Sequence, residues 1–126
     1  MVRVLAFGTF DRFHPGHDFF LRAAKAKGDV WVVVARDRTV ERVKGKRPVQ
    51  NEEERKQAVE HAFPDMHVLL GDPHDYLAPL RAVQPDLIVL GYDQTLPPGL
   101  TEADVPCAME RLPAHEPTKY KSSLLS

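Results

Sequence analysis

The sequence predicts an α/β protein with a doubly wound parallel sheet of about five strands and helices on both faces. Three observations carry this prediction. Short apolar runs rich in Val, Ile and Leu alternate with longer amphipathic stretches along the 126 residues. The apolar runs are nearly continuous, which is typical of strands that are covered on both faces. Strand and helix follow one another in turn, which favours right-handed crossovers and parallel pairing.

The predicted strands are brief, rich in Val, Ile or Leu, and bounded by Gly, Pro or Asp. They are Val2–Phe7, Val30–Ala35, Met66–Leu70, Leu87–Leu90 and a last strand near Ala108–Leu112. The predicted helices are His17–Ala26, Asn51–Phe63 and Tyr76–Val83, whose apolar residues recur at helical spacing. Asn51 and Glu54 have the spacing of a capping box at the start of the second helix. The stretch Thr95–Val105 contains Pro97, Pro98 and Gly99, which predicts an irregular loop or a short helix.

Composition sets limits on the class of protein. The length fits one domain spanning residues 1–126, and a formal net charge of −1 gives no reason to expect nucleic-acid binding. The single cysteine, Cys107, has no partner for an internal disulfide, which fits a reducing compartment. The longest apolar run, Val30–Ala35, is far too short to cross a membrane, and the first residues lack the pattern of a signal peptide. We therefore expect a cytoplasmic protein without membrane contact.

The segment GTFDRFHPGH, residues 8–17, follows the first predicted strand directly. In a doubly wound sheet, ligands bind where strands end and helices begin, so this segment lies where a binding site is expected. Gly8 permits a sharp turn, while Pro15 suits the first turn of a helix and Gly16 leaves the helix start uncrowded. His14 and His17 are three residues apart and fall on one side of that start, where backbone N–H groups and the helix dipole favour an anion.

Two other interpretations of the histidine pair are weaker. In the first interpretation, one histidine caps the helix or packs against the protein and the other is solvated. Two histidines in this position, after Gly-Thr-Phe-Asp and a strand, make that interpretation improbable. A zinc pair is disfavoured because a helix N-terminus repels a cation, and only Asp11 and Asp18 lie nearby as further ligands. We therefore predict no metal site made by these side chains.

The decapeptide resembles the signature of the nucleotidyltransferase superfamily that carries a His-x-Gly-His motif. Three segments, ARDRTVERVKGKRPVQNEEER (35–55), LGYDQ (90–94) and KYKSS (119–123), follow in the order and spacing of the small cytidylyltransferase-like members. Together they most resemble archaeal FAD synthases, which transfer AMP from ATP to FMN and release pyrophosphate. The resemblance implies one Rossmann-like nucleotidyltransferase domain over residues 1–126, with ATP and FMN as substrates. It also implies a divalent cation such as Mg²⁺, held mainly by the ATP phosphates, and a homodimer.

The resemblance also implies roles for individual residues. His14 and His17 would contact the triphosphate, Asp11 would help to orient the site, and a lysine after the second strand, Lys44 in preference to Lys46, would reach the phosphates. On composition alone, Arg55 would be an ordinary exposed charge. The resemblance makes it a candidate anchor of the substrate or of the geometry around Asp11. The remaining candidates for nucleotide contact are Gly8, Thr9, Phe10, Gly16, Gly91, Asp93, Gln94, Lys121, Ser122 and Ser123.

The chemistry of a phosphate monoester agrees with adenylyl transfer. Such a group is ionised at neutral pH, so its attack on the α-phosphorus of ATP needs positioning and charge neutralisation rather than a general base. Two alternatives stay open. One is a cytidylyltransferase that acts on glycerol phosphate or a related alcohol, although the chain has PTKYKSS where those enzymes carry an Arg-Thr-Glu-Gly-Ile-Ser motif. The other is a nucleotide-binding module without catalytic activity.

Overall fold

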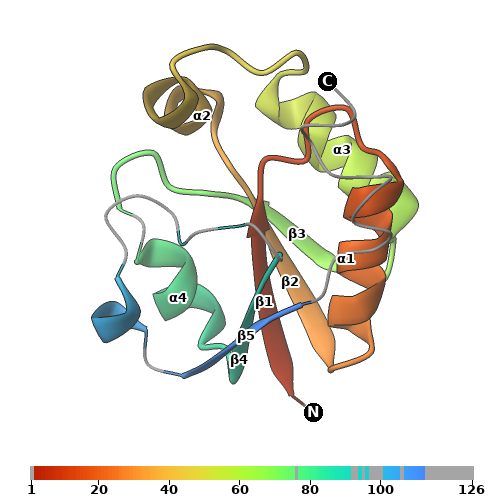
Figure 1. The fold of residues 1–126 in the computed structure, drawn as a ribbon, viewed down its shortest axis with the longest axis vertical. Helices are drawn as coiled ribbons and strands as arrows, with labels where there is room; N and C mark the ends of the chain where they lie inside the picture. Colours follow the sequence, from red (N-terminus) through yellow and green to blue (C-terminus); the bar gives the residue numbers. More distant parts are fainter. Residues whose placement is uncertain are drawn as a thin grey trace.

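The structure is a computed structural model that describes residues 2–75, 77–91, 94, 96, 101–105 and 107–112. Strands and helices alternate along the chain, except that α2 and α3 follow one another, as Figure 1 shows. In order they are β1 (Arg3–Gly8), α1 (Pro15–Lys25), β2 (Asp29–Val34), α2 (Asp37–Lys44), α3 (Glu52–Ala62), β3 (His67–Leu70), α4 (Ala78–Val83), β4 (Leu87–Leu90), a 3₁₀ turn (Glu102–Asp104) and β5 (Ala108–Arg111).

The five strands form one parallel sheet in the order β3-β2-β1-β4-β5. The central strand β1 pairs with β2 on one side and with β4 on the other, for example through Leu5 opposite Trp31 and Ile88. The chain therefore winds outward in both directions from β1. The carboxyl ends of β1 and β4 mark the position where the winding reverses, which is where open α/β sheets bind ligands.

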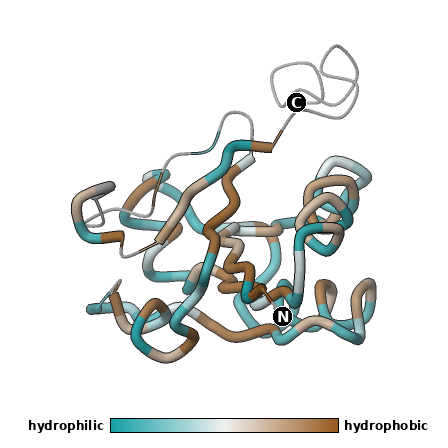
Figure 2. The backbone as a smooth tube through the Cα atoms, turned by 90° about the horizontal axis from the view of Figure 1, so that it is seen from below, coloured by the Kyte–Doolittle hydropathy of each residue, from teal (hydrophilic) through white to brown (hydrophobic). Residues whose placement is uncertain are grey.

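Two apolar clusters hold the helices on opposite faces of this sheet. On one face Leu21 and Ala24 of α1 and Val59 of α3 pack against Val4 and Val32. On the other face α4 contributes Leu80 and Val83, which join Leu5, Phe7 and Ile88. Figure 2 shows the apolar strands in the middle of the molecule, between the more polar helices. The predicted fold class, with about five parallel strands and helices on both faces, is confirmed.

Helix α2 is the element that the sequence analysis missed. The segment DRTVERVK is very polar, and only Thr39 and Val40 of this helix are buried, so its apolar pattern is too weak to predict a helix. Lys44, expected in a loop with Lys46 and Arg47, is instead the last residue of α2. The helix ends at Gly45, whose φ of 77° lies in the left-handed region that glycine adopts most easily.

The other predicted elements are confirmed with small shifts of their ends. Helix α1 begins at Pro15 rather than at His17, and α4 begins at Ala78, while the predicted first residue of that helix, Tyr76, lies outside the described residues. The capping box at Asn51 is present, because Asn51 Oδ1 accepts from Glu54 N and Glu54 Oε1 accepts from Asn51 N. Within the described part of the chain, no helix has the length and hydropathy needed to cross a bilayer.

Candidate active site

The turn between β1 and α1 has an unusual backbone. Phe10 and Arg12 have φ values of 54° and 53°, which residues other than Gly, Asn and Asp rarely adopt. The Phe10 ring folds back into the core, where it is 3% exposed, and it fills the space beside Gly8. A Cβ atom on Gly8 would lie 2.6 Å from two ring carbons of Phe10, so a side chain at Gly8 would displace the ring. The Phe10 side chain is therefore part of the core, and its expected contact with a nucleotide stays a prediction.

The two histidines together cap the first turn of α1. His14 is the N-cap residue, and its Nδ1 accepts from Gly16 N at 3.0 Å. His14 N in turn donates to Nδ1 of His17 at 3.4 Å, which completes a capping box built from imidazoles. Since Nδ1 of each ring accepts from the backbone, the neutral ring carries its proton on Nε2. Both rings can therefore donate a hydrogen bond from Nε2 at the start of α1.

Burial keeps these imidazoles neutral. Desolvation, the charge of His14 and the charge of Lys44 lower the pKa of His17 from 6.5 to about 4, although Asp11 acts in the opposite direction. Desolvation also lowers the pKa of His14. The two rings stack with their centroids 3.8 Å apart, and two charged imidazoles would repel each other at that distance. The pair thus provides hydrogen-bond donors without net charge at neutral pH.

Asp11 ties the turn to the segment before α3. Its Oδ1 accepts from Gln50 N at 2.9 Å and its Oδ2 accepts from Val49 N at 2.8 Å, while Arg12 N donates to Gln50 Oε1 at 3.0 Å. Burial works to raise the pKa of Asp11, but these two backbone hydrogen bonds and the charges of Arg55 and Lys44 outweigh it, so the pKa is lowered. The expected orienting role of Asp11 has a structural basis in this clamp.

Arg55 is buried, so the expectation of an ordinary exposed charge is wrong. Its side chain is 0% exposed, and each nitrogen donates to the protein: Nη1 to Thr9 O at 2.8 Å, Nη2 to Asp37 Oδ1 at 2.6 Å and Nε to Gln50 O at 3.0 Å. One guanidinium therefore joins the β1–α1 turn, α2 and the segment before α3. Of the two roles that the resemblance suggested, anchoring the geometry around Asp11 agrees with these contacts, while contact with substrate stays a prediction.

A second ion pair reinforces the same junction. Arg36 Nη1 donates to Glu52 Oε2 at 2.8 Å, and Glu52 Oε1 accepts from Asp37 N at 3.0 Å. The segments ARD and NEEER are therefore cross-linked twice, by Arg36 with Glu52 and by Asp37 with Arg55. Sequence reasoning missed Asp37, Gln50 and Glu52 as site-building residues, because their partners lie 15 to 39 positions away. The resemblance had drawn attention to both segments, and the capping box had drawn attention to the second.

Gln94 bridges the carboxyl ends of β1 and β4. Its Nε2 donates to Phe7 O at 2.7 Å and its Oε1 accepts from Gly91 N at 3.0 Å. Arg111 of β5, which the sequence analysis did not identify, donates from Nη1 to the carbonyl oxygens of Gly91 and Gln94, both at 2.7 Å. The side-chain amide of Gln94 thus builds the strand junction, and a nucleotide contact by Gly91 or Gln94 stays a prediction.

The structure gathers the amino-terminal candidates at one edge of the sheet. Gly8, Thr9, Asp11, His14 and Gly16 lie in the β1–α1 connection with His17, and Gly16 N is already engaged by His14. Lys44 lies close enough for its charge to lower the pKa of both Asp11 and His17. Four other candidates, Asp93, Lys121, Ser122 and Ser123, lie outside the described residues.

The described side chains form no cluster of three or more His, Cys, Asp or Glu groups that could hold a metal ion. Both carboxylate oxygens of Asp11, the acidic residue of this turn, accept backbone hydrogen bonds. The turn that carries the histidines therefore offers imidazole hydrogen-bond donors beside the charge of Lys44, and such groups can bind phosphate.

Comparison with known proteins assigns the class. The cytidylyltransferase-like family matches residues 5–119, and the chain belongs to this family. Among curated relatives, the protein of Methanosphaerula palustris is 48% identical over 105 residues, covering 82% of this chain and 67% of the relative. The Aciduliprofundum boonei protein is 53% identical over 95 residues, covering 75% and 63%, and the Methanosarcina mazei protein is 42% identical over 119 residues, covering 90% and 78%. All three are named FAD synthase, so the resemblance inferred from the motifs is confirmed.

A solved structure from Thermoplasma volcanium shares the fold. It has a TM-score of 0.78 and 32% sequence identity, and the match covers 92% of this chain and 99% of the other. That protein is described as a lipopolysaccharide core biosynthesis protein. Its fold agrees with that of the present chain, whereas its name differs from those of the relatives that are 41–53% identical.

Proposed function

We propose that this protein is an FAD synthase, which transfers AMP from ATP to FMN and releases pyrophosphate. The observation that carries the proposal is the pair of neutral imidazoles at the start of α1, which places two donors where β1 ends. Curated FAD synthases that are 41–53% identical support the choice of substrates. The chain spans between 63% and 78% of the length of these relatives, so the activity of the whole protein is part of the proposal.

In the proposed reaction, an oxygen of the FMN phosphate attacks the α-phosphorus of ATP. The new P–O bond forms as the bond from the α-phosphorus to the oxygen bridging the β-phosphate breaks, and pyrophosphate leaves with that electron pair. The attacking phosphate loses its second proton with a pKa near 6, so it needs no general base at neutral pH. Catalysis then depends on holding the two phosphates in line and on stabilising the charge that develops in the transition state.

Each group at the site would have a distinct task. The Nε2–H groups of His14 and His17 would donate to the oxygens of the triphosphate, where the helix N-terminus also favours negative charge. Lys44 would add the positive charge that the neutral histidines lack. Arg55 and Asp11 would act as positioning residues, because their hydrogen bonds fix the turn that carries the histidines.

A divalent cation, Mg²⁺ in particular, completes the proposal as a partner of ATP. It would be held mainly by phosphate oxygens, since Mg²⁺ in nucleotide enzymes is usually bound by one or two carboxylates together with substrate phosphates. When bound, it would neutralise charge on the phosphates. A homodimer belongs to the proposal on the strength of the resemblance, and a cytoplasmic location on the strength of the composition.

Product identification tests the function. The purified protein should be incubated with FMN or glycerol 3-phosphate, each with ATP or CTP, and the products separated by chromatography. The proposal predicts FAD from FMN with ATP, and pyrophosphate release only when both substrates are present. A CDP-alcohol formed from CTP would favour the cytidylyltransferase alternative. Nucleotide binding without any pyrophosphate release would favour a non-catalytic module.

A further inference from the structure

The imidazole of His17 has three other rings around it. It stacks on the ring of His14, with centroids 3.8 Å apart and an angle of 23° between the planes. Phe10 packs against it in a T-shaped arrangement, with centroids 5.3 Å apart, and Phe13 lies 5.5 Å away with its plane tilted by 50°. Among the described residues, the ring of His14 contacts only that of His17. The surroundings of the two histidines therefore differ.

Packing, more than hydrogen bonding, orients the His17 ring. The bond from His14 N to Nδ1 of His17 is 3.4 Å long, which makes it weak. Such a bond alone does not fix the rotation of the imidazole. The contacts with Phe10 and Phe13 restrict that rotation, since aromatic pairs of this kind are worth about 0.5–1.5 kcal/mol each. The direction of the Nε2–H group of His17 therefore depends on the two phenyl rings.

Phe13 connects His17 with the end of α3. The Phe13 ring lies 6.4 Å from the ring of Phe63 in a T-shaped arrangement, and Phe63 is the residue that ends α3. Phe63 is buried in the core, and the guanidinium of Arg22 lies over its ring at 5.7 Å. The Phe63 ring is therefore held from both sides, and Phe13 contacts this ring and that of His17.

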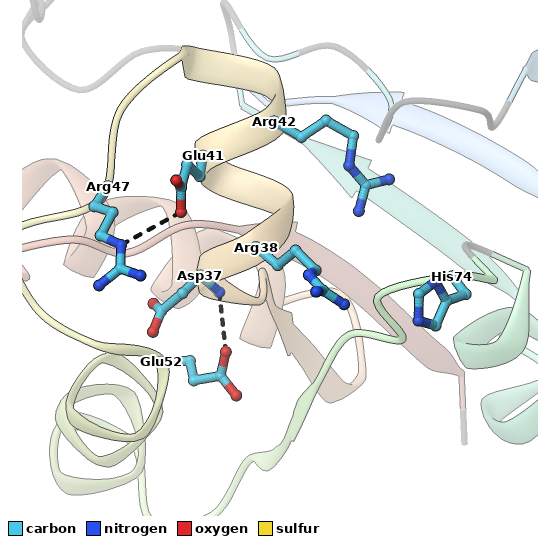
Figure 3. A pocket seen from close by; sticks show the side chains of 7 residues that line it. All are labelled: Asp37, Arg38, Glu41, Arg42, Arg47, Glu52 and His74. Carbon is cyan, nitrogen blue, oxygen red and sulfur yellow. Dashed lines mark hydrogen bonds and ion pairs between the residues drawn. The ribbon is translucent and has the colours of Figure 1, made fainter.

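Helix α3 is also tied to the site near its other end. Glu52 Oε1 accepts from Asp37 N at 3.0 Å, the bond drawn between these residues in Figure 3. Arg55 donates to a carbonyl oxygen of the β1–α1 turn at 2.8 Å. Helix α3 therefore holds this turn twice, through Arg55 near its start and through Phe63 and Phe13 at its end.

The groups around His17 act on its charge in different directions. Burial is the largest of the effects that lower its pKa, and the charges of His14 and Lys44 add to it, while Asp11 opposes it. His14 and Asp11 lie in the β1–α1 turn, and Lys44 is the last residue of α2. Since the Phe13 ring is part of what buries the imidazole, its loss would admit water to that side of His17.

We propose that Phe13 is a positioning residue for the transfer reaction, because it holds the His17 ring in place and shields it from water. The inference rests on the proposed function, in which His17 donates from Nε2 to the triphosphate. Phe13 acts through His17 and not on a reacting atom. Phe10 has a related contact, but it is almost fully buried and fills the space beside Gly8, so the partly buried Phe13 is the residue to change.

An NMR titration of His17 tests the shielding and needs no substrate. Wild type, Phe13→Ala and Phe13→Leu should be titrated with acid, and the spectrum of His17→Gln identifies the His17 signal. Phe13→Ala should raise the pKa of His17 from about 4 to roughly 5, and Phe13→Leu should raise it less. Phe20→Ala and Phe20→Leu are the matched controls, since Phe20 is also a partly buried phenylalanine on the same core cluster. Its ring has no contact with that of His17 in the described part of the chain, so these variants should leave the pKa unchanged.

Steady-state kinetics test the orientation of the ring. At neutral pH, His17 is uncharged in all these variants, so a change in turnover reports its position and not its charge. Phe13→Ala should lower the kcat of FAD formation roughly tenfold, less than the loss expected for His17→Ala, because the donor is displaced but still present. The KM values for ATP and FMN should change by no more than about twofold. Phe20→Ala should keep the kcat of the wild type.

The outcomes separate this inference from its alternatives. An unchanged pKa of His17 in Phe13→Ala would overturn it, and so would an unchanged kcat or the same rise in pKa in Phe20→Ala. A raised KM for ATP or FMN with the kcat of the wild type would mean that Phe13 contacts substrate directly. If Phe13→Ala does not fold, Phe13→Leu is compared with Phe20→Leu in the same way. If the wild type makes no FAD, the proposed function fails, and the titration still decides whether Phe13 shields His17.

Discussion

Replacing Arg55 with Met tests the junction that holds the β1–α1 turn in place. Methionine keeps much of the volume but removes all three hydrogen bonds, which leaves the carbonyl oxygens of Thr9 and Gln50 without this donor. Each buried acceptor left unpaired costs about 1–3 kcal/mol. The Asp37 carboxylate is 34% exposed, so water can replace part of its partner. The free energy of unfolding should fall by about 3–5 kcal/mol, within the range measured for breaking buried ion pairs.

The assay is equilibrium unfolding in urea without ligands, with a thermal scan beside it. For a domain of this size, that loss corresponds to roughly 10–20 °C in Tm. Arg22→Ala is the control, because it loses only an exposed i,i+4 pair with Asp18 and a contact over the Phe63 ring, which together should cost about 1 kcal/mol. The double change Arg55→Met with Asp37→Leu should recover part of the stability, since it removes the unpaired carboxylate too. A loss below about 1 kcal/mol in Arg55→Met would refute the reasoning.

Three further substitutions or conditions address the histidines and the carboxyl-terminal segment. His17→Ala should lower the turnover of FAD formation roughly a hundredfold while far-UV circular dichroism stays unchanged; near-native turnover would remove its proposed role. Because the pKa of His17 lies near 4 in the folded state and 6.5 in the unfolded state, the unfolding free energy should fall as pH drops from 6.5 to 4. The loss of unfolding free energy over this range should be at most roughly 3 kcal/mol, because partial exposure of the ring reduces it. The dependence of the unfolding free energy on pH should be weaker in His17→Gln. An unfolding free energy that does not change with pH in the wild type would contradict the low pKa. Truncation after Lys119 should weaken binding of ATP but not of AMP in calorimetric titrations, if Lys121, Ser122 and Ser123 bind the β- and γ-phosphates; equal changes for both nucleotides would defeat that assignment.

The strands and the histidine motif could be predicted because their signals are local. Runs such as Leu87–Leu90 consist of apolar residues, so their composition alone predicts that they are buried. Pro15 and Gly16, between the two histidines, indicate the start of a helix. The position of the motif after β1 then follows from the way open α/β sheets bind ligands.

The missed features depend on contacts between distant segments. Helix α2 buries little apolar surface, and its first turn is held by Asp37, whose partner Arg55 is 18 residues away. A buried arginine looks like a surface charge in sequence unless its partners are known. The histidines were expected to add donors to free backbone N–H groups, but in the structure their Nδ1 atoms accept from that backbone. The donors that remain for a ligand are the Nε2–H groups, and no sequence pattern specifies that tautomer.

Transfer of the α-phosphorus of ATP to FMN is the central claim, and a labelled substrate measures it most directly. The protein should be incubated with FMN, Mg²⁺ and ATP labelled either at the α- or at the γ-phosphorus, and the products separated by chromatography. The account predicts that the α label appears in FAD and the γ label in pyrophosphate, in equal amounts, with no transfer when riboflavin replaces FMN. An α label that remains in AMP or ADP, or a γ label that appears in a flavin, would contradict it.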